Sequence, residues 1–301
     1  MKSTWPRVLI GGFGLWVLTV LVTAATANST LVPTVVLLGS FLVPVTFAIW
    51  AYEHGRSGEI TVPLLFTSFV AGGVLGVLGA SVLETWLLHP AWWLYLGVGL
   101  IEEAAKLVAL MIVARRVRIR SSRDGLVLGA AVGFGFAAFE SAGYALDALL
   151  TADGMSLRSM LETEIVRGAL TPLGHGLWTA ILGGALFGAA RRHGRWRLDA
   201  TVLLAYLGVA LLHALWDSMH GIAIGLTLLL TGTPSQRGLM ERGHLPDATA
   251  AQAHLITVLN WTGLAAISLL ALAWLRVLAR RSRAEPPVPA RPDHPWRAGH
   301  R

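Results

Sequence analysis

The chain has no cysteine among its 301 residues, which excludes disulfides, thiolate metal ligands and cysteine nucleophiles. Charged residues are scarce at 14% of the chain, and only two of the 24 basic residues are lysines, Lys2 and Lys106. No stretch has the composition of a separate soluble domain. With 54% hydrophobic residues and a mean hydropathy of +0.62, the chain is instead typical of a protein that crosses a bilayer several times.

Apolar segments long enough to cross a bilayer, which takes about 20 helical residues, occur eight times. They lie near residues 8–26, 31–50, 61–83, 91–114, 125–149, 168–190, 200–230 and 255–279. The sequence therefore predicts an all-α, polytopic membrane protein with about eight transmembrane helices. The first segment is longer than the roughly 7–15 apolar residues of a signal-peptide core, so we expect a true span there. Gly221 and Gly225 indicate a kink or a change of direction in the overlong seventh segment.

The basic residues predict an orientation. If both termini lie in the cytoplasm, 19 arginine and lysine residues fall on the inner side. Only four fall outside, namely Arg158, Arg167, Arg237 and Arg242. The gathering of basic residues in the predicted cytoplasmic segments thus accounts for the net charge of +7, and we expect no nucleic acid partner. The loops 150–167 and 231–254 are expected outside, and the tail 281–301, rich in proline and charge, is expected to be disordered in the cytoplasm.

Three ionisable residues interrupt the fourth apolar segment: Glu102, Glu103 and Lys106. A charge near the bilayer centre costs about 2.5–3.5 kcal/mol, so such residues usually serve a function. On a helix, Glu102 and Lys106 are four residues apart and share a face, whereas Glu103 lies about 100° round the axis. The alternative is an ion pair that only fixes helix packing. It accounts for Glu102 with Lys106 but leaves Glu103 without a partner.

Polar residues also occur deep in the next three segments: Glu140, His175, and His213 with Asp217 four residues later. Counted from the inner ends, Glu103 and the first three of these lie roughly 18–24 Å deep, a common level that independent packing pairs would not produce. Two histidines with carboxylates are typical ligands of a zinc ion that keeps one position open for water. We predict Glu140, His175 and His213 as the ligands. Asp217 is predicted to orient His213 or to bind the metal itself.

In their order along the chain, these residues resemble the PrsW family of bacterial intramembrane proteases, which is related to the CAAX prenyl endopeptidases and bacteriocin-processing proteins. The family patterns EExxK, FExxxY, a single histidine and HxxxD are met at 102–106, 139–144, His175 and 213–217. Lys106 and Tyr144 argue against the CAAX enzymes, which carry EExxxR and FxxxH. The resemblance covers about 91–230, a catalytic core on spans four to seven. It leaves a three-span region at 1–90 and an outer loop with the last span at 231–280.

The resemblance implies hydrolysis of a peptide bond in a membrane-anchored protein at the bacterial inner membrane, and its best-known example is the first cut in an anti-sigma factor. The implied catalytic residues are Glu102, Glu103, Lys106, His175 and His213. Glu103 is predicted as the general base because Lys106 is expected to pair with Glu102 and to hold that carboxylate ionised.

Other functions stay open at the level of sequence. Intramembrane glutamate, lysine and histidine also build the proton relays of secondary transporters. A CAAX-type processing protease and a scaffold whose polar groups only hold helices together are further alternatives. A transporter needs no tightly held metal and leaves peptides intact, so metal analysis and peptide digestion separate it from a zinc protease.

Overall fold

The computed structural model of the chain describes residues 3–55, 60–115, 117, 121–152 and 154–285. Within these residues the only strands are β1 (Leu150–Thr151) and β2 (Gly154–Met155), which form a short hairpin. All other regular structure is helical. The helices are α1 (Trp5–Thr26), η1 (Ser29–Leu31), α2 (Val32–Gly55), α3 (Val62–Ala71), η2 (Gly72–Gly76), α4 (Val77–Leu87), α5 (Leu94–Ala114), α6 (Ser122–Leu149), α7 (Leu157–Leu170), η3 (Thr171–Leu173), α8 (His175–His193), α9 (Ala200–Thr231), α10 (Pro234–Glu241) and α11 (Ala250–Arg283).

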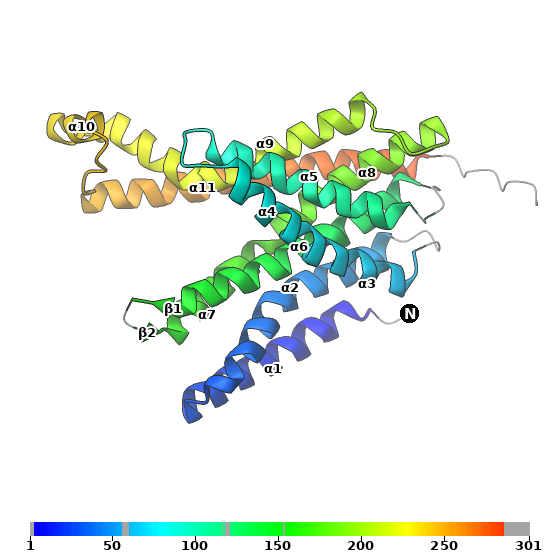
Figure 1. Cartoon of the computed structure of the whole chain (residues 1–301), viewed down its shortest axis with the longest axis horizontal. Coiled ribbons are helices and arrows are strands. Elements are labelled where there is room, and N and C mark those ends of the chain that lie inside the picture. Colours follow the sequence, from blue (N-terminus) through cyan, green and yellow to red (C-terminus); the bar gives the residue numbers. More distant parts are fainter. Residues whose placement is uncertain (1–2, 56–59, 116, 118–120, 153, 286–301) are drawn as a thin grey trace, which may run out of the picture.

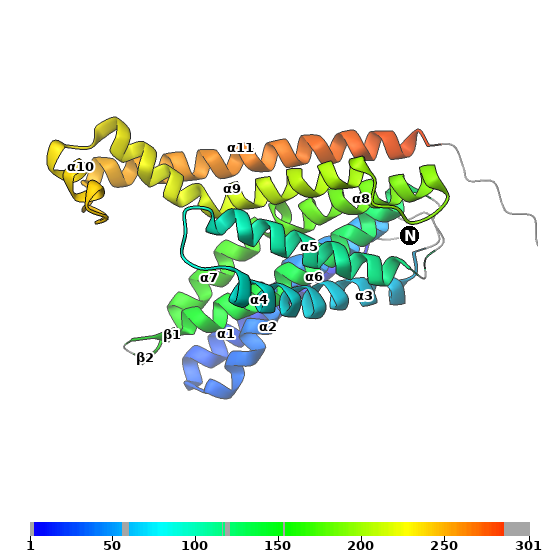
Figure 2. The same cartoon turned by 45° about the horizontal axis from the view of Figure 1, so that its top comes forward.

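Seven helical segments of the described chain are long and apolar enough to cross a membrane, which confirms the polytopic all-α fold. They are Trp5–Thr26, Ser29–Gly55, Val62–Leu87, Ser122–Leu149, Leu157–His193, Ala200–Thr231 and Ala250–Arg283. α5 is long enough at 21 residues, but three charged side chains set it apart from this group. In Figure 2, α5 runs through the bundle beside α6. The count of eight spans therefore stays a prediction that depends on α5.

The two ends of the bundle differ in what they carry. The start of α1 and the last turns of α11 lie at one end, and the hairpin and α10 lie at the other (Figure 1). Both predicted outer loops contain helical residues. In the first, the segment from Leu157 onward belongs to α7, where the charges of Arg158 and Glu162 pair at 2.7 Å one turn apart. The second contains α10. Of the tail 281–301 that was predicted to be disordered, residues 281–283 belong to the end of α11, so the prediction was wrong there, and residues 286–301 lie outside the described residues.

The seventh predicted segment corresponds to α9, a single helix of 32 residues. Its ribbon changes direction part-way along, between the part beside α8 and the part that leads to α10 (Figure 2). This bend agrees with the change of direction that the sequence indicated.

The core of the fold is the contact between α6 and α8, whose backbones touch along a row of glycines on α6. A Cβ atom built on Gly129 would lie 2.2 Å from the carbonyl oxygen of Thr179, and one on Gly133 would lie 2.2 Å from that of His175. Gly183 of α8 in turn faces the carbonyl oxygen of Gly125. Side chains at these positions would hold the helices apart, so glycine lets the two backbones approach closely.

The opposite side of α6 packs against the third span, again through glycine. A Cβ on Gly72, in the π-helical turn η2, would lie 2.1 Å from the carbonyl oxygen of Val132, and one on Gly135 would lie 1.9 Å from that of Phe69. α6 is therefore enclosed on two sides over its first part, and Glu140 follows this buried stretch and contacts His175 of α8. α5 packs on α9, and its polar side chains thereby also lie near the start of α8.

Candidate active site

His175 begins α8 at a break in the helical chain. α7 ends at Leu170, the short turn η3 contains Pro172, and Gly174 adopts a non-helical backbone conformation before α8 starts. Proline lacks the N–H that a continuing helix needs, so it favours this interruption. The close contact between the backbone of His175 and Gly133 then fixes where His175 lies along α6.

Lys106 is the centre of the polar cluster and is completely buried. Its Nζ lies 3.0 Å from Oε2 of Glu102, 2.8 Å from Oε1 of Glu103 and 2.8 Å from Nδ1 of His175. The expectation that Glu103 lacks a partner on its own helix was therefore wrong. A lysine reaches carboxylates both three and four residues before it, so one ammonium serves the two glutamates.

His213 connects the glutamates of α5 to α9. Its Nδ1 lies 3.0 Å from Oε1 of Glu103, and its Nε2 lies 3.3 Å from Oδ2 of Asp217 and 3.7 Å from Oε2 of Glu102. A carboxylate can only accept, so Glu103 holds a proton on Nδ1, while Nε2 faces the carboxylates of Asp217 and Glu102, which would also attract a cation. Asp217 thus lies where the sequence placed it, one turn beyond His213 and against its ring.

Glu140 meets His175 from the other side of the imidazole, with 3.1 Å between Glu140 Oε2 and His175 Nε2. The same carboxylate oxygen accepts a hydrogen bond from Arg167 of α7. Arg167 also donates from Nε to Ser141 Oγ at 2.9 Å, and its guanidinium lies 4.2 Å from the centre of the Tyr144 ring. Arg167 therefore fixes the position of Glu140, and Tyr144 supports Arg167 by a cation–π contact.

The residues present fit a metal ion. One ligand atom each of Glu102, His175 and His213 lies within 4.8 Å of the others. Ligands about 2.1 Å from zinc in a tetrahedron are roughly 3.4 Å apart, close to the 3.7 Å between His213 Nε2 and Glu102 Oε2. The ammonium of Lys106 already contacts two of the three residues, so their polar atoms face a common point that suits a cation. This group contains Glu102 where the sequence prediction had Glu140.

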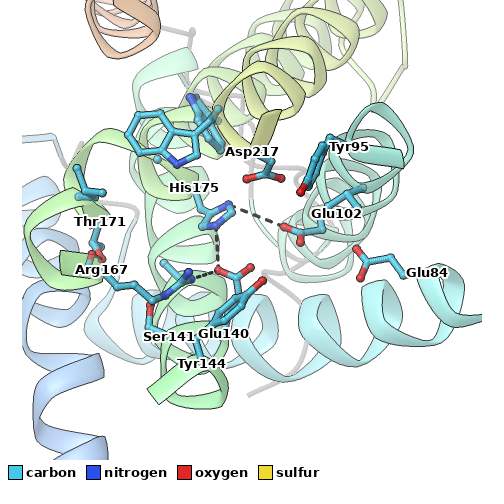
Figure 3. Close-up of a pocket in the computed structure, with 16 residues that line it drawn as sticks. Glu84, Tyr95, Glu102, Glu140, Ser141, Tyr144, Arg167, Thr171, His175 and Asp217 are labelled. Carbon is cyan, nitrogen blue, oxygen red and sulfur yellow. Dashed lines mark hydrogen bonds and ion pairs between the residues drawn. The ribbon is translucent and has the colours of Figure 1, made fainter. Parts of the chain in front are cut away.

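A cavity of about 380 Å³ opens onto this cluster, a size typical of ligand sites. Carboxylates from four helices line it (Figure 3): Glu84 of α4, Glu102 of α5, Glu140 of α6 and Asp217 of α9. Arg167 and His175 complete its polar wall, and Trp178 and Trp216 form part of its apolar wall. Glu103 is fully buried behind Lys106 and is not among the lining residues.

Sequence reasoning missed two charged members of this cavity. Arg167 was assigned to an outer loop, and Glu84 falls just beyond the predicted end of the third segment. Both were passed over because they lie near segment ends, where charge is common. A helical periodicity continued from His175 back through 157–170 would have drawn attention to Arg167. For Glu84 no signal in the sequence distinguishes it from an interfacial residue.

The comparisons with known proteins agree with this geometry. The family model described as PrsW family intramembrane metalloprotease matches residues 60–236, which is more than half of the chain and includes every residue of the cluster. Comparison with curated proteins and with solved structures found no match. On the strength of the family match, this chain belongs to the PrsW family of intramembrane metalloproteases.

Proposed function

We propose that this protein is a zinc-dependent endopeptidase that cuts a membrane-anchored protein, with Glu102, His175 and His213 holding the metal. The observation that carries this proposal is the convergence of these three residues from three different helices, with Glu102 and His175 lining a cavity inside the membrane-spanning region. Bound zinc supplies a Lewis acid and activates water near neutral pH. Asp217 and Glu103 hold the His213 ring from either side.

We assign the general base to Glu140 in place of Glu103. A base must come within hydrogen-bond reach of the proton that it removes, and Glu140 lines the cavity whereas Glu103 does not. His175 and Arg167 both contact Glu140 through Oε2, so Oε1 is the oxygen left to accept a proton from water. Glu103, through His213, and Lys106, through His175 and Glu102, then hold the metal ligands in place.

Metal analysis of the purified protein tests the ligands. We expect about one zinc per chain in the wild type, and its loss in Glu102→Gln, His175→Ala and His213→Ala. His220→Ala is the matched control, since His220 lies on α9 with His213 but is exposed and outside the cavity. Retention of zinc by all three ligand variants would overturn the metal site. Activity of a metal-free wild type would leave a protease that depends on glutamate alone.

Digestion of single-span proteins in liposomes tests the reaction. Glu140→Gln should abolish cleavage while zinc stays bound, whereas Glu103→Gln should keep measurable cleavage if its role is to hold His213. The first substrate to try is an anti-sigma factor with one transmembrane helix, because this is the family role that the resemblance implies. Full activity of Glu140→Gln would show that Glu140 is not the general base and that another carboxylate takes this role.

We also propose that the protein lies in a bacterial plasma membrane with both termini in the cytoplasm. The 19 basic residues that fall in the predicted cytoplasmic segments support this orientation. The shared position of the start of α1 and the end of α11 at one end of the bundle agrees with an even number of crossings (Figure 1).

A further inference from the structure

A second cavity, of about 480 Å³, lies away from the catalytic cluster. Its walls are the later part of α2 and the later part of α11, and its floor is formed by α6, η3 and α8. We call it the α2–α11 groove. None of the acidic or histidine residues of the cluster lines it.

The α2–α11 groove is apolar along most of its length and basic at one end. Phe47, Phe134, Leu177, Leu272 and Leu275 give it hydrocarbon walls. The side chains at the basic end of the groove are His54, Arg123, Ser282 and Arg283. Glu285, two residues after Arg283, is already engaged by Ser122 at 3.0 Å and by Arg191 at 3.7 Å. The end of the groove is therefore a basic site at the arginine-rich end of the bundle.

The depth of the groove matches one leaflet. From Arg123 at the basic end to Phe134 at the apolar end there are eleven residues of α6, or about 16 Å along the helix. This is close to half of the roughly 30 Å hydrocarbon core of a bilayer. A substrate helix that spans the membrane would need a groove about twice as long, so the depth favours an acyl chain.

We propose that the α2–α11 groove binds an anionic phospholipid, with one acyl chain along the apolar walls and its phosphate beside Arg123 and Arg283. Basic pockets between transmembrane helices are known to select anionic headgroups. The two arginines supply charge complementarity to the phosphate at this end of the groove.

The far end of the groove reaches the turn that places His175. Pro172, Leu173 and Gly176 line it, and a Cβ on Gly176 would lie 2.2 Å from the ring of Phe134. An acyl chain in the groove therefore packs against the outer side of the turn whose inner side presents His175 to the metal ligands. The bound lipid fills the space behind a catalytic element without entering the active site.

Lipid retention measured by native mass spectrometry tests this site. The full chain is reconstituted in nanodiscs with equal amounts of phosphatidylglycerol and phosphatidylcholine of identical acyl chains, then released from them. We expect phosphatidylglycerol to be retained over phosphatidylcholine by about thirtyfold, the factor expected if both arginines interact with the headgroup. Equal retention of the two lipids would overturn the proposal.

Variants separate the groove from general attraction to the arginine-rich end. R123Q/R283Q should lose the preference, whereas R195Q/R197Q, two exposed arginines at the same end but outside the groove, should keep it. Because Arg123 also donates to the carbonyl oxygen of His54, R283Q alone provides a variant that leaves this contact intact and should lose part of the preference. Ala279→Trp fills the apolar part and should reduce retention of both lipids. Unchanged retention in R123Q/R283Q or in Ala279→Trp would place the lipid elsewhere.

Discussion

Gly133→Ala tests whether the α6–α8 contact sets the geometry of the active site. The added Cβ would lie 2.2 Å from the carbonyl oxygen of His175, and ordinary contact begins at 3.4 Å. The start of α8 must therefore move by about 1.2 Å, the difference between the two distances. Overpacking of this kind costs about 1–3 kcal/mol of stability. A misplacement of about 1 Å at a catalytic group can lower the rate by about 100-fold.

Thermal unfolding in detergent, zinc content and substrate cleavage would be measured together for this variant. Gly143→Ala is the matched control, because it changes the same residue type on the same helix at a position with nothing within 4 Å. We expect Gly133→Ala to unfold at a lower temperature and to cleave about 100-fold more slowly, while the control resembles the wild type. If the two variants behave alike, the backbone contact does not position His175 and the argument from packing is refuted.

Four further predictions follow from named contacts. Lys106→Met should lower the free energy of unfolding by about 3–5 kcal/mol, since it leaves two buried carboxylates without their cation; thermal unfolding at pH 7 checks this. Arg167→Gln should lower cleavage about 10- to 100-fold with zinc retained, because Glu140 loses the group that orients it; Arg158→Gln, in an exposed pair on α7, is the control. Asp199 caps α9, and its hydrogen bond with Arg192 lowers the pKa of its carboxyl to about 2. Asp199→Ala should therefore destabilise the protein by about 0.5–2 kcal/mol at neutral pH, and the difference from the wild type should shrink as the pH falls below the ordinary pKa of 3.8 and disappear near 2. Single cysteines at Thr151 and Gly238 should react with an impermeant reagent added outside intact cells, and protection of both would reverse the proposed orientation.

The sequence could predict that polar residues from four helices lie at a common level, because the type and the depth of each residue can be read along a single helix. The register of Glu102, Glu103 and Lys106 was also known, yet the sharing of Lys106 was missed because only the four-residue spacing was considered. Which carboxylate faces the histidines depends on how α5 and α6 are rotated and spaced, and spacing along one chain segment does not contain that information. Glu102 therefore replaced Glu140 in the group that fits a metal only once the helices were placed.

The outer loop 150–167 illustrates a different limit. Four charged residues between Arg158 and Arg167 lower its hydropathy, and an isolated segment of this kind is typical of a loop. In the fold, Arg158 pairs with Glu162 along α7, Arg167 pairs with Glu140 of α6, and Glu164 accepts a hydrogen bond from Trp16 of α1. These partners lie on the same helix or far away in sequence, and the distant ones become visible only in three dimensions.

The sharing of Lys106 has a consequence for the overall charge of the site. The side chains linked by contacts around it include four carboxylates, Glu102, Glu103, Glu140 and Asp217, but only two permanent cations, Lys106 and Arg167. Four negative charges and two positive ones leave a formal charge of −2 with both histidines neutral. One divalent ion balances this charge, and an uncompensated charge inside a membrane protein is costly. A divalent ion held by Glu102, His175 and His213 would thus also act as the counter-ion of the cluster, so that losing the metal would leave the folded arrangement with uncompensated negative charge.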